Sequence, residues 1–144
     1  MITSFNHSGF VIRDLEKMVS FYKDDLGLEI EKEVDSKAPD SGDHTGIPGA
    51  HRTLVFVGKG GGHALELVYY INPESPKGHL ERNQLGAAHI AFNVDHIQDL
   101  YHSLIEKKIS FVTPPIMSTG LDGRQKGICY CQDPEGNWVE FIQS

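Results

Sequence analysis

The sequence contains few cysteines and few aromatic residues, and it has no long apolar run. Its two cysteines, Cys129 and Cys131, are two positions apart on an expected strand. Side chains at that spacing point to the same face, which is a poor geometry for a mutual disulfide. We therefore expect two reduced structural thiols in a cytoplasmic protein. No apolar stretch is long enough to cross a bilayer, and we see no secretory signal peptide near Met1, so a membrane role is not expected.

Basic residues are also scarce. The 144 residues include 13 Lys and Arg against 20 Asp and Glu, which gives a net charge of −7. A protein that binds nucleic acid needs a basic face for the phosphates, and an anionic membrane surface demands the same. We therefore expect the protein to bind neither nucleic acid nor an anionic membrane surface. The length suits one ordinary domain, or two half-size modules that share a core.

The most informative feature is an internal repeat. Residues 6–15 and 88–97 each place a histidine, His7 or His89, on an apolar strand that leads through an Asp into a helical pattern. Each half also closes on a strand with a glutamate between apolar neighbours, Glu66 or Glu140. The two halves therefore carry the same pair of metal-binding residue types at matching places.

The chain pattern predicts the element order βαβββ twice, an α+β fold. The expected strands are 5–12, 28–34, 53–57, 63–71, 87–94, 109–112, 127–132 and 138–142, and the expected helices follow Asp14 and Asp95. Loops are expected at 35–50 and 113–123. We predict a single domain, 1–144, made of a first module, 1–72, and a second module, 85–144. The two modules should form a curved mixed sheet with the helices on its outer face.

Strand periodicity places the candidate side chains on the face away from the helices. Ile90 and Phe92 belong to the apolar face, so His89 points the other way. Glu66 and Glu140 likewise alternate with apolar neighbours. Polar residues at such positions are usually just solvated. The repeat instead favours a shared function, because two imidazoles and two carboxylates suit a borderline divalent ion.

Several segments resemble one known family. They are residues 6–11, 21–22 with 26–28, 65–67, 86–94 and 133–141, and together they extend over nearly the whole chain. They resemble the vicinal oxygen chelate superfamily, which includes glyoxalase I, methylmalonyl-CoA epimerase, extradiol dioxygenases and bleomycin resistance proteins. The resemblance implies the glyoxalase fold. The set of candidate ligands is most similar to glyoxalase I, and the linker at 75–83 is more similar to the epimerases.

The resemblance also implies a metal centre and a reaction. His7, Glu66, His89 and Glu140 fall on the metal positions, for one divalent ion that could be Zn, Ni, Co, Mn or Fe. The implied activity is that of a metal-dependent isomerase or lyase, either a lactoylglutathione lyase or an epimerase. It would remove a proton next to the carbonyl of a small substrate. Glu140 is the first candidate for the base, and Glu66 is the second.

Alternatives remain open at this point. His7, His89 and Glu140 alone would suit an iron-dependent ring-cleaving dioxygenase, and a third possibility is a non-enzymatic small-molecule-binding resistance protein. Arg52 and Arg124 could bind a carboxylate or phosphate of the substrate, or could simply be surface charges. We also expect a homodimer, because the open edge strands of each module need partners.

Overall fold

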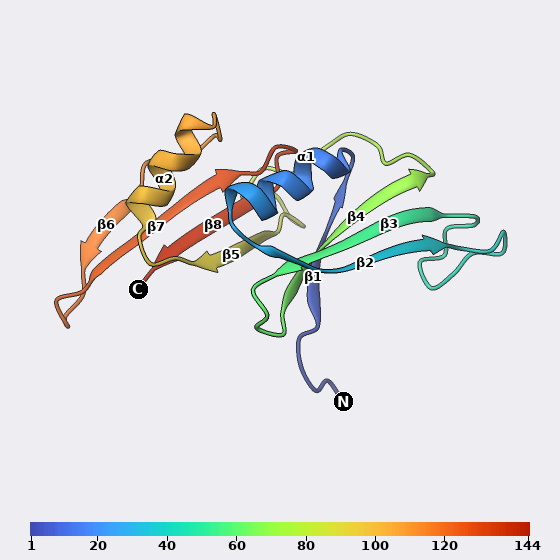
Figure 1. The fold of residues 1–144 in the computed structure, drawn as a ribbon, viewed down its shortest axis with the longest axis horizontal. Coiled ribbons are helices and arrows are strands. Elements are labelled where there is room, and N and C mark those ends of the chain that lie inside the picture. Colours follow the sequence, from blue (N-terminus) through green and yellow to red (C-terminus); the bar gives the residue numbers. More distant parts are fainter. The chain divides into compact units, whose positions relative to one another are not determined.

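The computed structural model describes residues 1–144 and divides them into two compact units, Met1–Lys77 and Gly78–Ser144. The strands of the first unit are β1 (His7–Ile12), β2 (Glu29–Lys37), β3 (His51–Gly58) and β4 (Ala64–Asn72). They form one sheet in the order β1-β4-β3-β2 (Figure 1). β1 is parallel to β4, whereas the β3–β4 and β2–β3 pairs are antiparallel. The sheet is therefore mixed, as predicted.

The second unit repeats this plan. Its strands are β5 (His89–Asn93), β6 (Ile116–Thr119), β7 (Gln125–Gln132) and β8 (Trp138–Gln143), in the order β5-β8-β7-β6 (Figure 1). β5 is parallel to β8, and the other two pairs are antiparallel. Each sheet thus has its first strand beside its last one, which confirms the predicted α+β repeat.

The helix of the first unit begins at a side-chain cap. Asp14 accepts a hydrogen bond from the backbone N–H of Lys17 at 3.0 Å, which satisfies a donor that the first helical turn leaves free. Helix α1 (Leu15–Ser20) then continues into a π-helical turn, η1 (Phe21–Asp25), where the sequence predicted one uninterrupted helix. The wider turn still buries Phe21 and the following tyrosine in the core.

In the second unit, helix α2 (Ile97–Glu106) contacts β8. The helix buries Ile97 and Leu104, and β8 buries Val139 and Phe141. Glu140 lies between these two buried apolar residues on β8, so strand alternation directs it to the opposite face. No helix in either unit is both long enough and apolar enough to span a membrane.

One strand prediction was wrong. Residues 109–112 form no strand, and Phe111 makes only an isolated bridge to Cys131. Strand β6 instead lies within the predicted loop 113–123. The turn that begins at Gly120 explains the difference, because its N–H donates to the carbonyl of Arg124 at 2.8 Å and closes a tight hairpin between β6 and β7. That hairpin fixes the pairing register of β6, whereas Pro114 and Pro115 cannot donate to a strand ladder.

Candidate metal centre

His7 and Glu66 form a close pair on neighbouring parallel strands. Gly9 on β1 is the register partner of Glu66 on β4, so His7 is two residues away on the same face. The Nε2 atom of His7 lies 3.2 Å from Oε2 of Glu66. A Cβ at Gly9 would lie 3.4 Å from that same oxygen, so only a very small residue leaves the carboxylate undisturbed.

His89 and Glu140 form the equivalent pair in the second unit. Here Ala91 on β5 is the register partner of Glu140 on β8, and His89 again lies two residues earlier. The Nε2 atom of His89 lies 3.3 Å from Oε2 of Glu140. In both units the histidine is the more open member, with side-chain exposures of 39% and 50%, and the carboxylate is mostly buried, with 15% and 11%. The repeat in the sequence is therefore a repeat in geometry.

An aromatic residue completes each pair. Phe56 on β3 is the register partner of Glu66, and Tyr130 on β7 is the register partner of Glu140. Each of these rings makes a T-shaped contact with the histidine of its pair, with centroid distances of 5.5 Å for His7 and 5.4 Å for His89. The sequence reasoning missed both aromatic residues, although each precedes its glutamate by ten positions.

The two pairs differ in their other polar neighbours. Nδ1 of His7 lies 2.7 Å from Oδ1 of Asn6, which can only accept a hydrogen bond, so Nδ1 carries the proton and Nε2, which faces Glu66, keeps its lone pair. In the second pair, Tyr130 neighbours both His89 and Glu140. Burial, and then the nearby carboxylate of Glu140, raise the pKa of Tyr130 above its ordinary value, so its proton stays in place.

The spacing within each pair fits a shared divalent ion. Two ligand atoms about 2.1 Å from one ion and about 3.2–3.3 Å apart subtend roughly 100° at it, between the octahedral and tetrahedral angles. An imidazole nitrogen and a carboxylate oxygen are also the donors that such ions accept. Each pair supplies two ligands, and no group of three or more His, Cys, Asp or Glu side chains able to hold a metal is present. That both pairs bind one ion stays a prediction.

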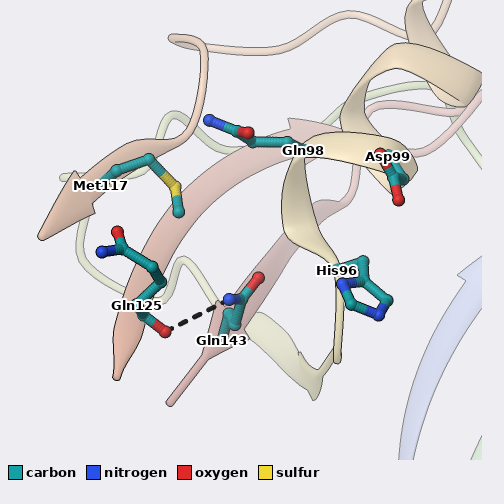
Figure 2. A pocket seen from close by; sticks show the side chains of 6 residues that line it. All are labelled: His96, Gln98, Asp99, Met117, Gln125 and Gln143. Atoms are coloured by element: carbon teal, nitrogen blue, oxygen red, sulfur yellow. Dashed lines mark hydrogen bonds between the residues drawn. The ribbon is translucent and has the colours of Figure 1, made fainter. Parts of the chain in front are cut away.

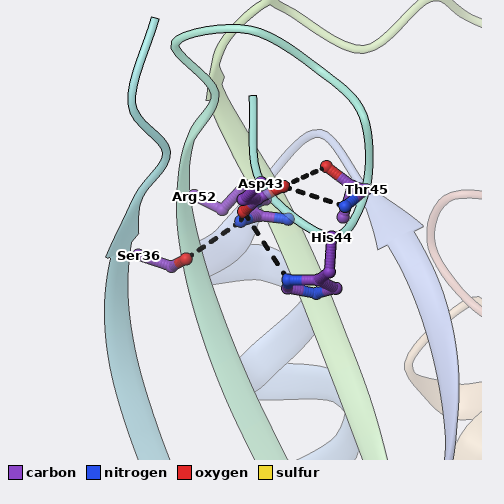
Figure 3. A network of polar contacts seen from close by, with 5 residues as sticks. All are labelled: Ser36, Asp43, His44, Thr45 and Arg52. Atoms are coloured by element: carbon purple, nitrogen blue, oxygen red, sulfur yellow. Dashed lines mark hydrogen bonds and ion pairs between the residues drawn. The ribbon is translucent and has the colours of Figure 1, made fainter. Parts of the chain in front are cut away.

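Arg52, a predicted substrate contact, lies on β3 in a network with the loop that precedes the strand (Figure 3). Its side chain is 3% exposed and donates to Asp43 and to Ser36, the latter at 3.0 Å. Nε of Arg52 has no hydrogen-bond partner. Hydrogen bonds from the side chain and backbone of Thr45, and then the guanidinium, lower the pKa of Asp43 to about 2. The guanidinium thus anchors this loop, and substrate binding by Arg52 stays a prediction.

Arg124, the other predicted substrate contact, lies in the turn between β6 and β7. Its side chain is mostly exposed, and its Nε lies 3.7 Å from Oδ2 of Asp122. A surface ion pair of this kind holds a side chain only weakly, so Arg124 is free to adopt other conformations. Its role in binding substrate also stays a prediction.

A separate hollow in the second unit lies where α2 begins (Figure 2). It has a volume of about 400 Å³ and is lined by His96, Gln98, Asp99, Met117, Gln125 and Gln143. Gln143 accepts from the N–H of Ile97 at 2.9 Å and donates to the carbonyl of Gln125 at 3.2 Å, so it caps the helix. None of the four candidate ligands lines this hollow.

The fold and the paired residues define a class of protein: repeated βαβββ modules that each carry one His–Glu pair on neighbouring parallel strands. The chain belongs to the Glyoxalase/Bleomycin resistance protein/Dioxygenase superfamily, whose family model matches residues 4–141.

Two curated relatives and one solved structure illustrate this similarity. The chain is 29% identical over 141 residues to methylmalonyl-CoA epimerase, mitochondrial, of Homo sapiens, and this match covers 96% of the chain and 73% of the relative. It is 22% identical over 158 aligned positions to lactoylglutathione lyase of Pseudomonas aeruginosa, and this match covers 97% of the chain and 82% of the relative. A glyoxalase family protein from Bacillus cereus has the same fold, with a TM-score of 0.87 at 18% identity over 99% of this chain and 95% of that one.

Proposed function

We propose that this protein is a divalent-metal-dependent isomerase or lyase that removes a proton next to the carbonyl group of a small substrate. The observation that carries the proposal is the matching geometry of the two pairs, His7 with Glu66 and His89 with Glu140, at 3.2 and 3.3 Å. In both halves the histidine lies two residues before the register partner of the glutamate. Polar side chains that are merely solvated have no reason to show the same pairing twice.

Each of the four candidate ligands has a role in this proposal. His7 and His89 would hold the ion through Nε2, and Glu66 and Glu140 would hold it through a carboxylate oxygen. The bound ion would polarise the substrate carbonyl and stabilise the negative charge left when the proton is removed. One of the two carboxylates accepts that proton as a general base, a role that typically contributes about 10²–10⁴-fold in rate.

The relatives support a substrate that is a small acyl compound carried on a thiol. The names of these two relatives refer to methylmalonyl-CoA and lactoylglutathione, both of which are thioesters. A thioester lowers the energy needed to remove the proton from the neighbouring carbon, which suits a carboxylate base. We extend this substrate class to the present chain as part of the proposal.

We further propose that the protein acts as a homodimer. The outer strands of the two sheets are β1 and β2 in the first unit and β5 and β6 in the second. Unpaired strand edges favour association with another strand or another copy. Sedimentation at micromolar concentration should give the mass of a dimer, and a monomer would contradict this part of the proposal.

The test combines metal analysis with hydrogen exchange. Protein purified without chelator is assayed for bound metal, and methylmalonyl-CoA and lactoylglutathione are incubated with it in D₂O. We expect one ion for each set of four ligands and incorporation of deuterium beside the carbonyl. His7→Ala and His89→Ala should lower the metal content, whereas Glu33→Gln, a change to an exposed carboxylate on β2, should not. Absence of metal from the unsubstituted protein would contradict the proposal, and oxygen uptake with Fe(II) and a catechol would favour the dioxygenase alternative.

A further inference from the structure

Arg82 differs from the other three arginines of the chain in its partners. Each of those arginines pairs with a carboxylate: Arg13 with Glu74, Arg52 with Asp43 and Arg124 with Asp122. Arg82 is exposed, and its side chain forms no ion pair and no hydrogen bond. This is unusual in a chain with 20 acidic and 13 basic residues, and it leaves all the N–H donors of this guanidinium available to a bound anion.

Arg82 is nevertheless held in place. Its guanidinium carbon lies 4.5 Å from the centroid of the Trp138 ring, a distance at which a cation is attracted to the ring face. Trp138 is itself only 6% exposed, and its indole N–H donates to the carbonyl of Leu80 at 2.7 Å. On the other side of Arg82, the N–H of Gln84 donates to the carbonyl of Glu81 at 3.0 Å and closes a turn. The indole and this turn together fix the side chain and the backbone of the arginine.

Trp138 adjoins the second candidate metal pair. It is the register partner of His89 on β5, and it precedes Glu140 on β8 by two residues. Register partners share one face of a sheet, and so do alternate residues of one strand. The ring that carries Arg82 therefore lies on the same face as His89 and Glu140, and all four residues belong to the same unit.

We propose that Arg82 binds an oxyanion of the substrate, either a carboxylate or a phosphate, beside the pair of His89 and Glu140. This inference rests on the proposed function and adds an anchor for a part of the substrate that does not react. A guanidinium stacked on a ring face keeps its N–H groups at its edge, where two of them can donate in parallel to one carboxylate or phosphate. Both thioesters considered above carry such groups, since CoA has phosphates and the methylmalonyl and glutathione parts have carboxylates.

The fluorescence of Trp138 provides a direct test, because this is the only tryptophan in the chain and its ring lies under Arg82. CoA, methylmalonate and glutathione are titrated separately into the protein. A fluorescence change with CoA assigns the oxyanion to a phosphate, and a change with methylmalonate or glutathione assigns it to the carboxylate of that probe. Arg82→Gln should raise the Kd for the effective probe about 10–100-fold, the usual worth of a hydrogen bond to a charged group.

Steady-state kinetics distinguish substrate binding from support of the fold. With the thioester that contains the effective probe, Arg82→Gln should raise KM for deuterium incorporation by a similar factor and leave kcat nearly unchanged, because a contact made equally before and during the reaction is lost. Arg82→Lys keeps the charge without the planar fork, and its KM should lie between the other two values. A fall in kcat together with loss of bound metal would show that Arg82 supports the metal pair instead, and would overturn the inference.

Lys108→Gln is the matched control, because it removes one positive charge from an exposed position of the same unit, after helix α2. Its Kd and KM should equal those of the unsubstituted protein, and a loss as large as that of Arg82→Gln would mean that net charge alone is responsible. The inference is also overturned if Arg82→Gln binds every probe normally, or if the unsubstituted protein binds none of them. Metal content and deuterium exchange test the proposed function separately. If both are absent, the proposed function fails, whereas the titrations still decide whether Arg82 binds an oxyanion.

Discussion

Asn6 provides a sharp test of the metal assignment, because it contacts a candidate ligand without being one. Its Oδ1 lies 2.7 Å from Nδ1 of His7, a short hydrogen bond that fixes the tautomer and the ring orientation. The residue before the other histidine is Ala88, which has no such group. Replacement of Asn6 by alanine should therefore loosen one ligand and leave the other three untouched.

The expected size of the effect follows from the exposure of this hydrogen bond. Orienting partners of metal ligands are typically worth about 10–100-fold in affinity. Asn6 is exposed, so water can replace its oxygen after the change, and we expect the lower end of that range. A tenfold loss corresponds to about 1.4 kcal/mol. Asn6→Asp keeps an oxygen acceptor at the same place and should retain the affinity of the unsubstituted protein.

Competition between the protein and a chromophoric chelator for Zn²⁺ measures this difference directly, and His7→Ala serves as the reference for complete loss of the ligand. The result that would refute the reasoning is specific. If Asn6→Ala binds Zn²⁺ as tightly as the unsubstituted protein while His7→Ala binds it weakly, the hydrogen bond does not orient the ligand. If His7→Ala also binds normally, His7 is not a ligand.

Three further predictions concern stability and reactivity. The pKa of Asp43 falls from 3.8 to about 2 on folding, so its contribution to stability is fully present above pH 3.8 and is lost as the pH falls toward 2. In an acid titration, the free energy of unfolding of Asp43→Asn should therefore lie below that of the unsubstituted protein above pH 3.8, and the two values should converge below pH 2. Gly127→Ala should lower the free energy of unfolding by about 1–3 kcal/mol in a urea titration, because the new Cβ would lie 2.7 Å from a methyl group of Ile97 and 2.8 Å from the sulfur of Met117. An unchanged midpoint would show that both side chains move aside freely. Burial raises the pKa of Cys129 to about 11 and that of Cys131 to about 12. Both thiols should therefore resist alkylation by iodoacetamide at about pH 8 until urea unfolds the protein. Rapid alkylation of the native protein would contradict their burial.

Much of the fold could be predicted because period-two alternation is local. The apolar neighbours of Glu66 and Glu140 correctly indicate strands with one buried face, and the cap at Asp14 correctly indicates the start of a helix. The position of β6 could not be obtained in this way. Residues 109–112 alternate as a strand does, but the pairing of β6 depends on a hairpin turn at Gly120 and on the partner strand β7. Pairing partners are a property of the assembled sheet, so propensity along one segment does not reveal them.

The candidate site, too, could be predicted only as far as local sequence patterns reach. The repeat was sufficient to predict that both halves carry a histidine and a glutamate at matching places, and the structure brings the two members of each half about 3 Å apart. That all four bind one ion stays a prediction. It was not sufficient to predict that Arg52 is held by Asp43, because that contact depends on how the loop before Ala50 folds back over the strand. The contacts of Phe56 and Tyr130 with the two histidines were missed because an aromatic residue on a strand ordinarily belongs to the core.

The strand register of the two pairs has a consequence for how this chain can change over time. The loop before Ala50 makes the first half longer, with 59 positions between His7 and Glu66 against 51 between His89 and Glu140. The two pairs nevertheless have almost the same separation, because the ladder between parallel neighbours sets it and the length of the connection does not. Insertions in that loop should therefore be tolerated. A single extra residue inside β1 or β4, between the pairing positions, would instead turn one member of the pair toward the helix and abolish the site in one step.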